Sequence, residues 1–189
     1  MINYNQQIYD AAIKNGATNW LAKLLIAQSR YETGDFGNRQ TKENNNIFGF
    51  KWSPNSRYAK KGNISPEGDP YAKYDTIDDA IADYINRWMS LNSKEGGTRL
   101  QEFNKIPEGD TLTFATKLKN YGYYHTPSNQ TREQSINQYK GGVDAKIKRM
   151  VVVDWYFANK KTINTTAFIF LGIGAAATIL YILKKRKVI

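Results

Sequence analysis

Between Leu21 and Gly34 the sequence carries an apolar repeat at helical spacing that ends at a glycine. The repeat consists of Leu21, Leu24, Leu25 and Gln28, which share one helical face. Glu32 continues this face one turn later, so we expect its carboxyl group to lie near the core. Thr18 or Asn19 can cap the start of the helix, and Gly34 can end it in the left-handed conformation. The segment therefore predicts a half-buried helix with an acid in its last turn.

The position of Glu32 at a helix end predicts a raised pKa for its carboxyl group. The unpaired carbonyl groups of the last turn carry partial negative charge, and partial burial removes water from the carboxylate. Both effects disfavour the charged form and raise the pKa. A carboxyl group with a raised pKa can donate a proton near neutral pH, as the general acid of a glycosidase must. We therefore expect Glu32 to be a catalytic acid; a solvated glutamate at a helix end is the alternative.

The residues around Glu32 and an asparagine-rich loop downstream form a two-part motif. The first part comprises Ala27, Gln28, Glu32, Thr33 and Gly34, and the second comprises Asn45, Asn46, Ile47, Phe48, Gly49, Phe50 and Lys51. Together they resemble the core motif of the lysozyme-like N-acetylglucosaminidases of glycoside hydrolase family 73. The resemblance implies a mainly α, lysozyme-like α+β fold with a small β-hairpin or irregular loop. It also implies cleavage of the β-1,4 bond between N-acetylglucosamine and N-acetylmuramic acid in the glycan strands of peptidoglycan.

The same resemblance implies roles for further residues. Substrate contacts are implied for Gln28, Asn46, Phe48 and Tyr124. A second catalytic acid is implied in the region of the hairpin, where we prefer Glu67 and keep Asp69 as the alternative. The turn after residue 122 resembles the turn that lines the family's cleft, so Tyr123 or Tyr124 is expected there, and Tyr123 is given a catalytic role. If neither acid acts, the N-acetyl group of the substrate or a cleft tyrosine can assist instead.

The rest of the chain predicts a mainly helical domain over residues 1–160. Helices are predicted over residues 6–14, 77–88 and 112–120, and the third of these elements is followed by a polar loop over residues 128–137. Thr76 and Asp79 form a capping-box pair before the second of them. A last helix is indicated by Val143, Ile147, Met150, Val151 and Trp155. Residues 52–70 are rich in proline and glycine, which predicts a loop or a short irregular hairpin.

Composition argues against several kinds of site. The chain has no cysteine and one histidine, His125, so a disulfide framework, a thiolate nucleophile and a histidine-rich metal site are not expected. The net charge of +10 would suit a nucleic-acid partner, but six of the basic residues flank one apolar segment and no nucleic-acid motif is present. We expect no cofactor, no metal and no specific nucleic acid.

Residues 167–183 contain no charged side chain, and Thr165 and Thr166 extend this run to 19 residues. Such a run can span a bilayer, and Lys160, Lys161 and the basic residues 184–187 would anchor its ends. We therefore expect one transmembrane helix within residues 161–189 and a single-pass protein in a virion membrane or in the bacterial cytoplasmic membrane. Gly172 and Ala176 form a small-residue pair that can support a homo-oligomer.

The N-terminal residues are polar, so we expect no signal peptide, although peptidoglycan lies outside the cytoplasm. A bacteriophage whose virion contains a membrane would resolve this conflict, with the enzyme among its virion proteins and acting in genome delivery or host lysis. Two other functions stay open. One is a lytic transglycosylase, which can use a single glutamate, and the other is a wall-binding or structural virion membrane protein without activity.

Overall fold

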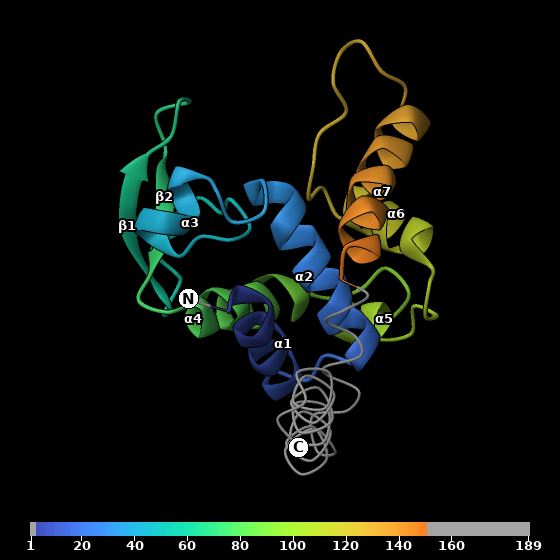
Figure 1. Cartoon of the computed structure of the whole chain (residues 1–189), viewed down its shortest axis with the longest axis horizontal. Coiled ribbons are helices and arrows are strands. Elements are labelled where there is room, and N and C mark those ends of the chain that lie inside the picture. The colour runs from blue at the N-terminus through green and yellow to red at the C-terminus, as the bar shows by residue number, and fades with distance from the viewer. Residues whose placement is uncertain (1–2, 151–189) are drawn as a thin grey trace, which may run out of the picture. The chain divides into compact units, whose positions relative to one another are not determined.

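The computed structural model describes residues 3–150, which form a set of helices and one small sheet (Figure 1). The helices are α1 (Tyr4–Lys14), α2 (Asn19–Thr33), α3 (Arg39–Asn44), α4 (Ile77–Asp83), the π-helix η1 (Tyr84–Met89), α5 (Arg99–Phe103), α6 (Thr111–Asn120) and α7 (Arg132–Lys148). The strands β1 (Ala59–Ile64) and β2 (Pro70–Tyr74) are antiparallel. In Figure 1 the two strands and α3 lie on one side of α2, whereas α6 and α7 lie on the other.

Helix α2 forms the centre of the core, as its apolar repeat predicts. The hydroxyl of Thr18 accepts a hydrogen bond from the backbone N–H of Leu21 at 3.2 Å and caps the helix. Gly34 adopts φ 59° and ψ 55°, the left-handed conformation that ends it. The four members of the repeat are buried, and α2 packs against α1 and α7. The predicted helix, its cap and its end are confirmed.

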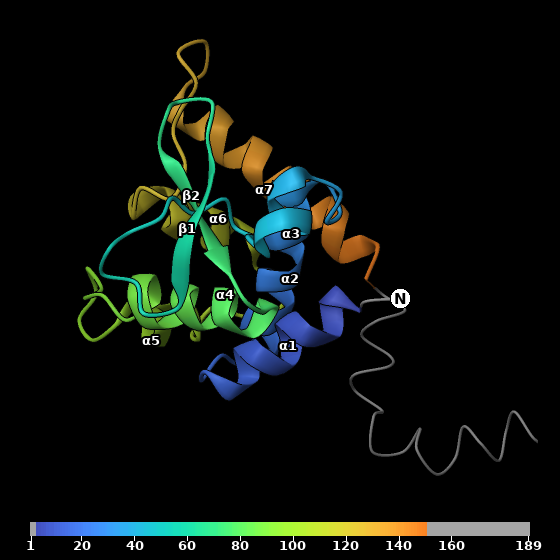
Figure 2. The same cartoon turned by 90° about the vertical axis from the view of Figure 1, so that its left-hand side faces the viewer.

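The segment rich in proline and glycine forms the expected irregular hairpin. Ala59 pairs with Tyr74, and the register shifts between Lys61 and Ile64. The hairpin contacts α3 and α4 (Figure 2). A buried carboxylate, that of Asp83 in α4, ties β2 to this helix by accepting a hydrogen bond from the hydroxyl of Tyr74 at 2.8 Å.

The predicted helix over residues 77–88 is present but changes type halfway. Thr76 and Asp79 form the predicted capping box, in which the Thr76 hydroxyl accepts a hydrogen bond from the Asp79 N–H at 3.1 Å. After Asp83 the chain continues as the π-helix η1. Single π-helical turns occur frequently at functional sites. Here the π-helix carries Tyr84 and Trp88, whose rings lie 5.4 Å apart.

Helix α7 begins earlier than predicted. The predicted loop over residues 128–137 is wrong, because α7 already starts at Arg132. The pattern misleads because α7 is polar along most of its length and contains the adjacent glycines Gly141 and Gly142, which disfavour helix. A Cβ atom on Gly142 would lie 2.5 Å from Cδ2 of Tyr31. Glycine at this position therefore allows α2 and α7 to approach each other closely.

The expectation of a transmembrane helix in the fold requires correction. Among residues 3–150, no helix is long and apolar enough to cross a membrane. Residues 161–189, on which the predicted span and the single-pass membrane localisation rested, lie outside the described part of the chain. The fold is thus a mainly helical domain with a small two-stranded sheet, and the assignment to a membrane is withdrawn. Residues 1–148 form one compact unit, while the predicted domain boundary at residue 160 also falls outside the described residues.

Candidate active site

Glu32 lies in the last turn of α2 with its side chain half-buried. The hydroxyl of Tyr139, on α7, donates a hydrogen bond to Glu32 Oε1 at 2.6 Å. Burial raises the pKa of Glu32 above its ordinary value, and the hydrogen bond from Tyr139 partly offsets this rise. The direction of the shift is the one that the sequence predicts, and desolvation is its main cause.

Several tyrosine side chains lie within range of the charge on the Glu32 carboxyl group. Its charge interacts with four of them, Tyr31, Tyr84, Tyr123 and Tyr139. Burial raises the pKa of each of these hydroxyls, so all four stay protonated and neutral near neutral pH. Neutral hydroxyls can donate hydrogen bonds to the carboxylate but cannot supply the full positive charge that would hold its pKa low.

An aromatic cluster adjoins this acid, and we define it as Phe48, Phe50, Tyr84, Trp88 and Tyr123. The ring of Tyr84 lies at its centre, 4.2 Å from Phe48 and 5.5 Å from Phe50, with the second pair stacked at 7°. Trp88 meets Tyr123 edge to face at 5.7 Å. A hollow of about 350 Å³ opens at one end of the cluster, between Phe50, Trp88 and the cations Lys51 and Arg87. Aromatic faces of this kind are suited to stacking on sugar rings.

Gln28, an expected substrate contact, is completely buried behind the aromatic cluster. Its Oε1 atom accepts a hydrogen bond from the Tyr84 hydroxyl at 3.1 Å. Its Nε2 atom forms no hydrogen bond of normal geometry within residues 3–150, but the Gln28 side chain lies close enough to the Tyr123 hydroxyl to offset part of the rise in pKa that burial causes for that group. The geometry makes Gln28 a support for Tyr84, whereas its contact with a sugar stays a prediction.

Asn46 and Phe48, also expected substrate contacts, shape the loop that follows α3. The Asn46 side chain accepts a hydrogen bond from the Phe50 N–H at 3.0 Å and donates to the carbonyl groups of Phe50 and Ala72 at 2.8 and 3.0 Å. Phe48 is only 5% exposed and packs into the aromatic cluster. Both residues therefore hold Phe50 beside β2, and their direct contact with a substrate stays a prediction.

The two candidate cleft tyrosines have different places. Tyr123 belongs to the aromatic cluster, interacts with the Glu32 charge, and donates its hydroxyl to the Phe48 carbonyl at 3.2 Å. Tyr124 donates to the Ala115 carbonyl at 2.9 Å and stacks face to face on Tyr139, with the ring centroids 4.2 Å apart. Of the two, Tyr123 is the one that lies beside the acid and the aromatic cluster.

Glu67 and Asp69, the candidate second acids, both lie in the turn between β1 and β2. Glu67 is largely exposed and its Oε2 atom lies 2.7 Å from the Lys51 ammonium group. The hydrogen bond from Lys51 lowers the pKa of Glu67 to about 2. The environments of Glu32 and Glu67 thus push their pKa values in opposite directions. The described residues contain no group of three or more potential metal ligands.

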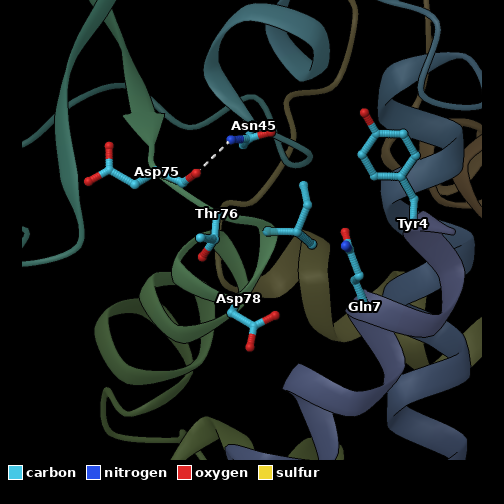
Figure 3. Close-up of a pocket in the computed structure, with 7 residues that line it drawn as sticks. Tyr4, Gln7, Asn45, Asp75, Thr76 and Asp78 are labelled. Carbon is cyan, nitrogen blue, oxygen red and sulfur yellow. Dashed lines mark hydrogen bonds between the residues drawn. The ribbon is translucent and has the colours of Figure 1, made fainter. Parts of the chain in front are cut away.

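Figure 3 shows a second hollow, of about 400 Å³, and Glu32 is not among the residues that line it. It is lined by Tyr4, Gln7, Asn45, Asp75, Thr76, Ile77 and Asp78. The Asn45 side chain donates a hydrogen bond to the Asp75 carbonyl at 3.1 Å. This bond fastens the loop after α3 to the start of α4. The residues around the hollow therefore have a structural role, and we do not assign the hollow to the active site.

Sequence reasoning missed Tyr139, the direct partner of Glu32. A usable signal is present, because Ile136, Tyr139 and Val143 recur at helical spacing and are all buried in α7. The polar residues between them and the two glycines hide this pattern. A search for the buried face of a polar helix would have placed Tyr139 toward α2.

Comparison with known proteins places the chain in a family. No curated protein matches the sequence. A solved structure described as a type VI secretion system effector-immunity complex from Pseudomonas protegens is 15% identical, covers 77% of this chain and 89% of its own, and has a TM-score of 0.48, which is too low to support an argument. The glucosaminidase family, described as mannosyl-glycoprotein endo-beta-N-acetylglucosaminidase, matches residues 7–169, including Glu32 and every element from α2 to α7. The protein therefore belongs to the glucosaminidase family and is a glycosidase.

Proposed function

We propose that this glycosidase cleaves the β-1,4 bond between N-acetylglucosamine and N-acetylmuramic acid in peptidoglycan, with Glu32 as the general acid. The observation that carries the proposal is the half-buried Glu32 carboxyl group, whose pKa is raised by burial and whose charge acts on Tyr84 and Tyr123 of the aromatic cluster. A glycosidase needs an acid that keeps its proton near neutral pH, next to a surface that can hold a sugar.

In the proposed reaction, the Glu32 carboxyl group gives its proton to the bridging oxygen. The bond from this oxygen to C1 of N-acetylglucosamine breaks, and N-acetylmuramic acid leaves with a free 4-hydroxyl group. Positive charge develops at C1 in the transition state, and water then adds there and loses a proton. The aromatic cluster would hold the sugar next to the acid, and Tyr123, a member of this cluster, is the candidate cleft tyrosine.

Glu67 is our candidate for the second carboxylate. Its pKa of about 2 keeps Glu67 ionised near neutral pH, while the raised pKa of Glu32 favours the protonated form of that group. An ionised carboxylate can stabilise positive charge at C1 or accept the proton of the attacking water. In glycosidases the catalytic acid and its partner commonly have pKa values that are shifted in opposite directions, so that one is protonated while the other is ionised. Asp69 and the N-acetyl group of the substrate are the alternatives.

The test is digestion of purified peptidoglycan by the full chain, with wild type, Glu32→Gln and Glu43→Gln compared. Glu43 serves as the control because it is an exposed carboxylate on α3 that bonds Arg39. Wild type and Glu43→Gln should release fragments with reducing N-acetylglucosamine ends, identified by mass after borohydride reduction, whereas Glu32→Gln should release none. Equal digestion by Glu32→Gln would eliminate Glu32 as the acid.

The same digest separates the other functions. Fragments that end in an anhydro sugar would identify a lytic transglycosylase. Binding to peptidoglycan without any release of fragments would identify a wall-binding protein. Neither the geometry of residues 3–150 nor the family match bears on the expected roles in phage genome delivery or host lysis, or on virion and homo-oligomer partners.

A further inference from the structure

The hydrogen bond between Tyr139 and Glu32 uses only one of the two carboxyl oxygens. Tyr139 Oη lies 2.6 Å from Glu32 Oε1. We infer that Tyr139 is a positioning residue, which fixes Oε1 of Glu32 so that Oε2 carries the proton to the glycosidic bond. This inference rests on the proposed role of Glu32 as the general acid.

Tyr139 is held in place by neighbouring aromatic rings. Tyr124 stacks on one face of its ring, 4.2 Å away and tilted by only 6°. The ring of Tyr31 meets it at 5.1 Å and 79°. Tyr139 is only 5% exposed, so its hydroxyl has little access to water as a competing partner. A side chain fixed in this way can hold the direction of the bond to Glu32 through the catalytic cycle.

The chemistry of a protonated carboxyl group makes this bond selective. Such a group has one O–H donor, and its other oxygen is an acceptor. Burial raises the pKa of the Tyr139 hydroxyl well above its ordinary value, so it stays a donor. Because Oε1 accepts this hydrogen bond, the carboxyl proton is placed on Oε2. The bond also favours the charged form of Glu32 and limits the rise in pKa that burial causes.

The groups that face Glu32 come from each surrounding element. Tyr31 lies on α2, Tyr84 on η1, Tyr123 in the segment after α6, and Tyr139 on α7. On α2 the nearest cation in sequence is Arg30, which is paired with Asp35 at 2.7 Å. On α7 the nearest cation to Tyr139 is Lys140, which is paired with Asp144 at 2.6 Å, and Lys146 further along is paired with Asp35 at 2.7 Å. Tyr139 is the neighbour with a hydrogen bond to Glu32 among the described residues, so its removal should act on Glu32 directly.

The test is the pH dependence of peptidoglycan cleavage by full-chain Tyr139→Phe. Phenylalanine keeps the ring and its stacking on Tyr124 but removes the hydroxyl. We expect kcat to fall about tenfold, the effect of losing one hydrogen bond to a charged group, with KM little changed. We also expect the alkaline limb of the kcat profile to move to higher pH, because the bond that favours the charged form of Glu32 is gone.

A matched control removes another tyrosine–carboxylate bond. Tyr121 donates its hydroxyl to Glu102, and Tyr121→Phe should keep the wild-type pH profile. An unchanged profile in Tyr139→Phe, or a rise in KM at constant kcat, would overturn the inference. Glu32→Gln is measured in parallel: if it keeps wild-type activity, the proposed function itself fails, whereas an inactive Glu32→Gln beside an unshifted Tyr139→Phe refutes only the role of Tyr139.

A measurement on wild type covers the case in which Tyr139→Phe does not fold. The Tyr139 hydroxyl proton is expected to appear in the NMR spectrum as a slowly exchanging, downfield signal. Its shift should follow the titration of the Glu32 carboxyl group. A hydroxyl signal whose chemical shift does not change during this titration would overturn the inference.

Discussion

The contact between α2 and α7 can be tested with a pair of neighbouring glycines. A Cβ atom on Gly142 would lie 2.5 Å from Cδ2 and 2.7 Å from Cζ of Tyr31, and closer still to Cε2. A Cβ atom on Gly141 would have no heavy atom within 4 Å. The two substitutions to alanine therefore change the same helix in the same way, except that only one of them meets Tyr31.

The expected magnitudes follow from this difference. Replacing a glycine inside a helix by alanine stabilises it by about 1 kcal/mol, and Gly141→Ala should gain this amount. Carbon atoms pack best at about 3.5–4.0 Å, so the Gly142→Ala methyl group would overlap the nearest atom of the Tyr31 ring by about 1.5 Å unless the ring shifts. Overpacking of this kind costs about 1–3 kcal/mol. Gly142→Ala should thus be about 1–3 kcal/mol less stable than Gly141→Ala.

The assay is urea denaturation of the full chain, followed by a measurement of peptidoglycan cleavage. The urea midpoint of Gly141→Ala should be higher than that of wild type. The midpoint of Gly142→Ala should be lower than that of Gly141→Ala. Because the ring of Tyr31 packs against Tyr139, Gly142→Ala should also lower kcat, while Gly141→Ala leaves it unchanged. Equal stability and equal kcat in the two variants would refute the close approach of α2 and α7.

Three further predictions concern the acid, its partner and the loop. The folded-state pKa of Glu32 is raised, so the folded protein holds this proton more tightly and loses stability as the pH rises from the ordinary glutamate pKa of about 4.3 through the raised value. Glu32→Gln avoids this loss, so the unfolding free energy of Glu32→Gln minus that of wild type should increase with pH over that interval. A difference that does not change with pH would contradict the raised pKa. Glu67→Gln, at an exposed position, should reduce cleavage without changing the urea midpoint, and full activity would shift the second role to Asp69 or the substrate. Asn46→Ala leaves the polar backbone groups of Phe50 and Ala72 without their partner, and should cost about 1–3 kcal/mol of stability together with activity, whereas an unchanged midpoint would contradict its role in the loop.

The parts of the fold with strong local signals could be predicted from the sequence. Thr18, the apolar repeat and Gly34 together define α2, because capping and burial act within a few residues of each other. The capping box of α4 and the helix ending near Asn120 are local in the same sense. Proline and glycine over residues 52–70 disfavour a helix, so a loop or a short irregular hairpin is predicted there, and the structure has the hairpin.

Features that depend on packing between distant segments were not predictable in the same way. The short helices α3 and α5 carry too few residues for a periodic pattern, and the π-helix η1 continues an α-helical pattern without a break in sequence. Asn46 matches a motif but its contacts lie within the loop and on β2, which no spacing reveals. Tyr139 meets Glu32 from 107 positions away, across the contact that Gly142 allows.

The central claim is that Glu32 acts as a general acid, and a substrate with a good leaving group tests it most directly. The substrate is the disaccharide in which N-acetylmuramic acid is β-1,4-linked to an N-acetylglucosamine that carries 2,4-dinitrophenol at C1. Dinitrophenolate leaves without protonation, so Glu32→Gln should cleave this glycoside at close to the wild-type rate, while its cleavage of peptidoglycan falls by about 10²–10⁴-fold. An equal loss on both substrates, or no loss on peptidoglycan, would contradict the role of Glu32 as the acid.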